Sequence, residues 1–248
     1  SVGTGSSFSS ASFTEPQPSD MGFDIMHINL HKTFSTPHGG GGPGAGPVAV
    51  NKKLSEFLSN PHVVYNQNEK KYSFNFSNTP TIGKVHSFFG NFGILVRAYV
   101  YILSLGRNGL KSVAQNAVLN ANYLKYLLKD SYDVPFNKGT LHEFVISAQK
   151  QKKKGYKALL IAKKILDYGF HSPTVYFPIN VEEAIMIEPT ETETKETLEN
   201  FAHSMIEINS QIDKNDTSLH DAPFNTPIRK LDETKANREL NVKWKNEV

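Results

Sequence analysis

Residues 24–50 read DIMHINLHKTFSTPHGGGGPGAGPVAV, and this stretch carries the prediction of the fold. Its first seven residues alternate, with Met26, Ile28 and Leu30 on the same side of the chain. A period of two is typical of a β-strand with one packed face. A second apolar run, residues 48–50, predicts a second strand after the glycine tract.

Lys32 is the residue in this stretch with the clearest chemical potential. His31, Lys32 and Thr33 follow the first strand, and α/β sheets place ligands at the carboxyl ends of their strands. An amino group in an apolar neighbourhood has a lowered pKa and can then attack an aldehyde. Pyridoxal phosphate (PLP) is an aldehyde of this kind and acts as an electron sink. A lone lysine after a strand is more often a surface residue, so the surrounding sequence is needed to distinguish a surface lysine from a cofactor-binding one.

A glycine tract follows the lysine, since six of the eight residues at 39–46 are glycine. Glycine in such number costs backbone entropy, so we expect the tract to let the backbone approach a ligand or move. Gly39, Gly41 and Gly44 also satisfy the dinucleotide pattern GxGxxG, but Pro43 interrupts it and no acidic residue follows at the required distance. A phosphate-binding P-loop is excluded because no Gly-Lys-Ser/Thr ends the tract.

Three histidines in the same stretch raise the question of a metal site. On an extended strand His27 and His31 lie about 13 Å apart, which is too far to share one ion. We therefore predict no metal at His27, His31 and His38. His31, next to the lysine, is expected either to orient or relay protons near Lys32 or to pack on the cofactor ring.

Composition sets broad limits on the function. The chain has 248 residues, enough for a sizeable core, and its net charge of +3 is too weak to indicate nucleic acid as a partner. It contains no cysteine, which excludes disulfides and thiolate chemistry. No stretch reaches the roughly 20 apolar residues of a membrane span, and the N-terminus does not resemble a signal peptide. We therefore expect a cytoplasmic protein that binds neither membrane nor nucleic acid.

Four segments resemble one known family. LHKTFSTPHGGGGPG, at residues 30–44, is similar almost residue for residue to the Schiff-base lysine segment of the glycine decarboxylase P-protein family of the glycine cleavage system. The resemblance extends to GNFGILVRAYVYILSLGRNGL, GFHSPTVYFP and EPTETETKETLENF, so it runs from about residue 20 to the tail. It specifically resembles subunit 2 of the form in which the enzyme is split between two chains.

This resemblance implies a fold, a cofactor and a reaction. The fold would be α/β, namely the C-terminal part of a fold type I (aminotransferase-like) PLP enzyme. Lys32 would hold PLP as a Schiff base, His31 would assist catalysis, and Thr33 would contact the cofactor. Gly39, Gly40, Gly41 and Gly42 would also line the cofactor site or admit the lipoyl arm. The substrate would be glycine, whose aminomethyl group passes to the lipoylated H-protein, and the sister subunit 1 would complete a hetero-oligomer.

Two alternatives stay open. The segment that precedes the lysine in the family, with most cofactor contacts, does not precede it here, so the chain looks like the C-terminal half of a subunit and is expected to be inactive alone. It would then serve as a non-catalytic binding or dimerisation module. The other alternative is a different fold type I enzyme, such as another decarboxylase or an aminotransferase.

The expected organisation has four parts. Residues 1–20, rich in serine and proline, read as a leader or linker that is possibly not native. Residues 21–131 would hold the end of the large domain and the connecting helices. Residues 132–215 would form a small α+β domain, with the order strand, helix, strand, strand, helix. Residues 216–248 would form a polar tail anchored by Trp244.

Local sequence patterns predict further helices and one irregular segment along the chain. We expect a helix at residues 51–60, an irregular surface segment at 62–86, and a buried helix at 92–105 whose Arg97 needs a buried partner. Gly109 would precede a separate amphipathic helix, and residues 149–167 would form one helix that ends at Gly169.

The remaining charged residues are assigned to structure rather than chemistry. The lysines between positions 150 and 157 are most simply a solvated helix start, with docking of an acidic partner such as the H-protein as the alternative. His142, His171 and His220 each lie in a segment that resembles the family, but no geometry connects them with Lys32.

Overall fold

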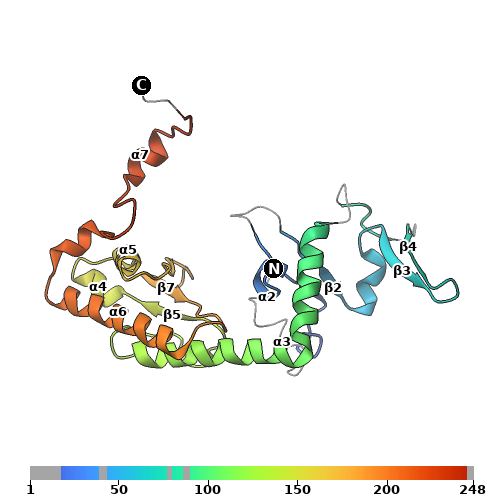
Figure 1. The fold of residues 1–248 in the computed structure, drawn as a ribbon, viewed down its shortest axis with the longest axis horizontal. Coiled ribbons are helices and arrows are strands. Elements are labelled where there is room, and N and C mark those ends of the chain that lie inside the picture. The colour runs from blue at the N-terminus through green and yellow to red at the C-terminus, as the bar shows by residue number, and fades with distance from the viewer. Residues whose placement is uncertain (1–17, 39–43, 77–79, 86–89, 245–248) are drawn as a thin grey trace. The chain divides into compact units, whose positions relative to one another are not determined.

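The computed structural model of the chain describes residues 18–38, 44–76, 80–85 and 90–244 (Figure 1). The chain divides into two compact units, Ser1–Asn116 and Ala117–Val248. Each unit has a hydrophobic core of its own. The four-part division at residues 20, 131 and 215 remains a prediction.

In the first unit, the predicted pair of strands around the glycine tract is confirmed. Strand β1 (Ile25–His27) pairs antiparallel with β2 (Val48–Val50), with Met26 opposite Ala49. The first strand is shorter than the sequence indicated, because a short helix, α2 (Leu30–Thr33), begins at the last alternating residue. The carbonyl of Asn29 accepts hydrogen bonds from the backbone N–H groups of Lys32 and Thr33, which turns the chain at this point.

The prediction of an irregular segment at residues 62–86 is wrong for its first half. Strands β3 (His62–Asn66) and β4 (Lys71–Asn75) form an antiparallel hairpin with five residues in each strand. Asn66 Oδ1 accepts hydrogen bonds from the N–H groups of Asn68 and Glu69, which closes the turn. The expected helix at residues 51–60 is a 3₁₀ helix, η1 (Lys52–Phe57).

Helix α3 (Phe92–Leu128) consists of two helical segments joined at a kink, so the two helices expected around Gly109 are present, with the break three residues earlier than predicted. Its non-helical residue is Gly106, at φ 62° and ψ −176°. The first part of α3 was expected to be buried, and this is wrong. Ile94 and Ala98 are buried, whereas Arg97 is exposed and needs no buried partner. The large apolar side chains that are exposed here form what we call the α3 stripe: Phe92, Leu95, Val96, Tyr99, Val100 and Leu103.

Gly106 offers a test of the break in α3. Its backbone occupies a region that is essentially restricted to glycine, and no atom lies within 4 Å of where a Cβ would be placed. We therefore expect Gly106→Ala to destabilise the chain by about 1–3 kcal/mol through backbone strain alone. Gly93→Ala, at a position where a Cβ meets only ordinary contacts, should be neutral or stabilising by up to about 1 kcal/mol. Urea unfolding of both variants checks this, and equal effects would contradict it.

The second unit contains the predicted small α+β arrangement. Its sheet has the order β5-β7-β6, with β5 (Phe144–Ser147), β6 (Thr174–Val175) and β7 (Ala184–Ile187) all antiparallel. Helices α5 (Ala158–Asp167) and α6 (Lys195–Asp213) pack against each other beside this sheet (Figure 1).

The two faces of this sheet belong to different apolar clusters. Ile146 and Ile185, paired across β5 and β7, are buried in the main core with the helices. Their neighbours Val145 and Met186 belong to a smaller cluster, as expected for side chains that alternate along a strand. Thr194 Oγ1 accepts a hydrogen bond from the N–H of Thr197 and caps the start of helix α6.

Two further expectations for the second unit are wrong. The single helix at residues 149–167 is two helices, α4 (Gln149–Lys153) and α5, because Gly155 adopts φ 96° between them. Trp244 does not anchor the tail, since it is 88% exposed. The tail instead contains a 3₁₀ helix, η2 (Thr217–Asp221), with buried Leu219, and helix α7 (Glu233–Arg238).

The lysines at the start of α4 are engaged within the chain. Lys150 lies 2.5 Å from Asp133 and Lys154 lies 2.6 Å from Asp213, both exposed ion pairs. Lys152 contacts Glu182 at 2.9 Å and the buried Glu183 at 3.1 Å. These contacts favour the structural interpretation of the lysine cluster. Among the described residues, no helix has both the length and the apolar character needed to cross a membrane.

Candidate active site

Helix α2 presents Lys32 at the surface of the first unit. Leu30 and Phe34 are buried against the first part of α3, so they fix the helix from one side. Lys32 is exposed, and its amino group makes no hydrogen bond or ion pair with any residue that the structure describes. In the described part of the chain the amino group is therefore accessible to a ligand.

The turn between β1 and α2 is held by a short polar contact. His27 Nε2 lies 2.8 Å from Asn29 Oδ1, within hydrogen-bonding distance. Gly46 lies against the imidazole of His27, and a Cβ placed at Gly46 would overlap this ring. A side chain at position 46 would therefore displace the imidazole of His27 and disturb its contact with Asn29.

His31 is the most unusual group beside the lysine. Among the residues that the structure describes, its buried Nδ1 has no hydrogen-bond partner, and its ring meets that of His38 edge-to-face at 4.2 Å between centroids. Burial lowers the pKa of His31 below its usual 6.5, and the nearby His38, Lys32 and His27 lower it further. At neutral pH the imidazole next to Lys32 is therefore uncharged and able to accept a proton.

The lowered pKa of His31 predicts how the stability of the chain depends on pH. Because the folded chain binds the proton of His31 less readily than the unfolded chain, this residue costs stability as the pH falls below 6.5. By NMR, we expect the imidazole signal that His31→Gln removes to titrate with a midpoint below 6.5. His38→Ala should move that midpoint upward, since His38 is the second-largest cause of the shift. A midpoint at or above 6.5 in the unmodified chain would contradict this assignment.

Two threonines near Lys32 are buried. Thr33, predicted to contact the cofactor, is 7% exposed, and Thr36 is 6% exposed. The Oγ1 of Thr36 is buried without a hydrogen-bond partner, and sequence reasoning missed this residue. The φ of 53° at Ser35, just before it, shows how sharply the chain turns after α2. The predicted cofactor residues Gly39, Gly40, Gly41 and Gly42 lie outside the described residues.

The described residues near Lys32 fit a phosphate-bearing aldehyde such as PLP. Buried polar atoms without partners are rare in folded proteins, and two of them, His31 Nδ1 and Thr36 Oγ1, lie in the segment that carries Lys32. A hydroxyl can donate to a phosphate oxygen, and an exposed primary amine can attack an aldehyde carbon. In the part of the chain that the structure describes, His27, His31 and His38 do not form a three-donor metal group.

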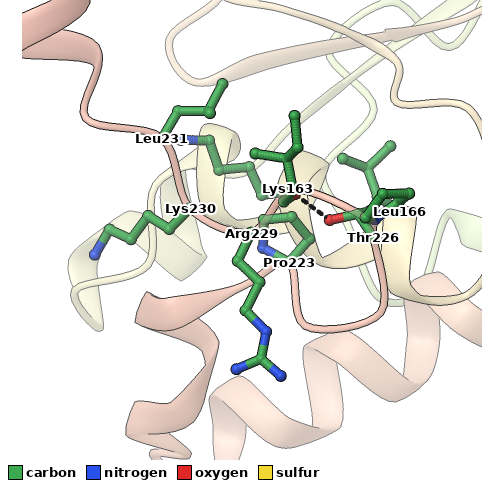
Figure 2. Close-up of a pocket in the computed structure, with 9 residues that line it drawn as sticks. Lys163, Leu166, Pro223, Thr226, Arg229, Lys230 and Leu231 are labelled. Atoms are coloured by element: carbon green, nitrogen blue, oxygen red, sulfur yellow. Dashed lines mark hydrogen bonds between the residues drawn. The ribbon is translucent and has the colours of Figure 1, made fainter. Parts of the chain in front are cut away.

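Other candidate residues lie elsewhere in the chain. His171 is exposed, and His220 stacks on Tyr156 with ring centroids 5.0 Å apart. A surface pocket of about 400 Å³ in the second unit contains none of the predicted site residues (Figure 2). Its labelled lining residues are Lys163, Leu166, Pro223, Thr226, Arg229, Lys230 and Leu231.

Comparison with known proteins identifies the family. The family model for the C-terminal domain of glycine dehydrogenase matches residues 113–229. Over 230 residues, 92% of this chain, the sequence is 50% identical to the probable glycine dehydrogenase (decarboxylating) subunit 2 of Chloroherpeton thalassium. It is 53% identical over 228 residues to the protein of the same name from Bacillus cereus. The chain belongs to the glycine decarboxylase P-protein family.

This member of the P-protein family spans about half the length of the curated relatives it matches, 47% and 46% of the two proteins named above. Its fold is similar to a crystal structure of glycine decarboxylase (P-protein) in inhibitor-bound form, with a TM-score of 0.65 and 20% identity, over 80% of this chain and 46% of the other. A cysteine desulfurase from Thermococcus onnurineus matches 81% of this chain and 50% of its own, with a TM-score of 0.54 and 12% identity. The fold type I class predicted from the sequence is thereby confirmed.

Proposed function

We propose that this chain carries the PLP-binding lysine of a glycine dehydrogenase (decarboxylating). In this proposal the enzyme decarboxylates glycine and transfers the remaining aminomethyl group to the lipoyl group of the H-protein. The observation that carries the proposal is the exposed amino group of Lys32 on α2, in a segment that also contains two buried polar atoms without partners. Membership of the family supports the choice of glycine as substrate.

Each nearby side chain has a defined task in this proposal. When bound, PLP supplies the electron sink for the electron pair left by the departing CO₂. Lys32 Nζ would hold the cofactor through its aldehyde group, and its free amino group could accept or donate a proton. Thr36 Oγ1 would be available to donate a hydrogen bond to an acceptor oxygen of the cofactor. His31, held neutral, is available to accept a proton or a hydrogen bond at Nδ1.

A partner subunit is part of the proposal. The relatives are named subunit 2, which supports a sister subunit 1 in the working enzyme. The α3 stripe supports a protein partner too, because contiguous exposed apolar surface usually marks an interaction site. We place the residues that complete the cofactor pocket outside the described part of this chain, since Lys32 is exposed there.

Covalent trapping tests the cofactor assignment. The chain is incubated with PLP, reduced with borohydride and mapped by mass spectrometry, both alone and together with subunit 1. We expect an adduct on Lys32 that is stronger when the partner is present. Exchange of the glycine carboxyl group with labelled bicarbonate, in the presence of lipoylated H-protein, separates this function from that of another decarboxylase or an aminotransferase.

The α3 stripe also favours a second candidate function, a non-catalytic binding or dimerisation module. This candidate predicts no adduct on Lys32 under any condition, including with subunit 1 present. An adduct that forms only with the partner would instead support the enzyme and agree with the expectation that the chain is inactive alone.

A further inference from the structure

Three side chains able to bind a metal ion meet at one end of the sheet in the second unit. Glu143 immediately precedes β5, Glu188 immediately follows β7, and His142 lies beside them. The donor atoms of the three residues all lie within 4.8 Å of one another. His142 Nε2 is 3.8 Å from Glu143 Oε2 and 3.8 Å from Glu188 Oε1.

The pairing of the strands explains why the two carboxylates meet. Phe144 lies opposite Ile187 in the antiparallel register, so one further step places Glu143 opposite Glu188. Like charges directly opposite each other on neighbouring strands are unfavourable unless a cation lies between them. The chain bends at His142, which takes this residue out of the strand alternation and brings its imidazole to both carboxylates.

The burial of the three side chains suits a site with one fixed ligand and two adjustable ones. The side chain of His142 is only 9% exposed, so the surrounding protein fixes its ring. The side chains of Glu143 and Glu188 are 39% and 46% exposed, so their carboxylates can rotate at the surface. A cation from solvent can therefore reach the carboxylates without opening the core.

We propose that His142, Glu143 and Glu188 bind one Zn²⁺ ion that joins the ends of β5 and β7. Zn²⁺ accepts imidazole nitrogen and carboxylate oxygen together, whereas Ca²⁺ and Mg²⁺ prefer oxygen ligands alone. Ligands at about 2.0–2.2 Å from a tetrahedral Zn²⁺ lie about 3.3–3.5 Å apart. The carboxylates need to approach the imidazole by only a few tenths of an ångström from their 3.8 Å distances. Water completes the coordination.

The proposal is tested on the full chain after treatment with a chelator, by calorimetric titration with ZnCl₂ and by thermal unfolding. We expect Zn²⁺ to bind and to raise the unfolding temperature, because it binds only the folded arrangement. The chain has no cysteine that would compete for the ion. His142→Ala and Glu188→Gln should each remove one equivalent of binding or weaken it more than tenfold. Glu188→Gln changes an exposed carboxylate into an amide of the same shape, so it tests the site without disturbing the core.

Matched controls exclude other imidazoles. His171→Ala removes an exposed histidine of the same unit, and His38→Ala removes one ring of the histidine pair beside Lys32. Both variants should still bind the equivalent of Zn²⁺ that His142→Ala and Glu188→Gln lose. If Glu188→Gln still binds this equivalent of Zn²⁺ with unchanged affinity, or if His38→Ala no longer binds it, the site is not the one proposed. Equal stabilisation by Ca²⁺ or Mg²⁺ would also overturn the choice of metal.

Discussion

Alanine in place of Lys32 will leave the complex with subunit 1 without a borohydride-stable PLP adduct and will reduce glycine–bicarbonate exchange by about 10²–10⁴-fold. This range is that of losing a positioned group that donates and accepts protons in the transition state. Loss of covalent attachment adds to the effect, because alanine has no amino group to bind the aldehyde. Mass spectrometry of the reduced complex and the exchange rate are the two measurements.

Two variants control this experiment. Lys32→Arg keeps a positive charge at the exposed position but supplies no nucleophilic amine, so it should fail as alanine does. Lys53→Ala removes another exposed lysine of the same unit and should leave both adduct and exchange unchanged. An adduct of full strength in Lys32→Ala would move the cofactor to a different lysine and remove the basis of the proposed function.

The largest effect on stability is expected in the second unit, at Ile185. This residue is 1% exposed in β7, the central strand, where Ile146 of β5 and Val175 of β6 lie opposite it. Ile185→Ala removes buried methyl and methylene groups and leaves a cavity, which typically costs about 2–5 kcal/mol of unfolding free energy. Urea unfolding followed by circular dichroism measures this loss.

Ile179 supplies the matched control, because the same substitution there removes a side chain that is 92% exposed. Its expected cost is within about 0.5 kcal/mol. Similar losses for the two variants would mean that the antiparallel sheet β5-β7-β6 does not form the core of this unit as described.

The sequence predicted the strongly patterned elements of the second unit well. The order strand, helix, strand, strand, helix expected for residues 132–215 is present, apart from the division of its first helix, and Thr194 caps α6. These features depend on side-chain periodicity and capping, which are local properties of the chain. The split between α4 and α5 was missed because residues 149–154 are all glutamine or lysine, which favour helix, so that only Gly155 marks the break.

In the first unit, local patterns were less informative. The hairpin of β3 and β4 contains exposed Val63, Tyr65, Tyr72 and Phe74, but its many polar residues concealed their alternation. The apolar run at the start of α3 indicated a buried helix, whereas the α3 stripe is exposed. Hydrophobicity predicts that a surface will be buried, but it does not determine whether the same chain or a partner chain buries it.

For the candidate site, the sequence by itself determined the lysine, because a long and specific segment surrounds Lys32 and ties it to one family. Only the tertiary structure decided the surroundings of that lysine: the exposure of its amino group, the contact between His31 and His38, and the buried hydroxyl of Thr36. The physical reason is that covalent reactivity belongs to the residue type, whereas burial, pKa and unpaired hydrogen-bonding groups arise from contacts that exist only after the chain has folded.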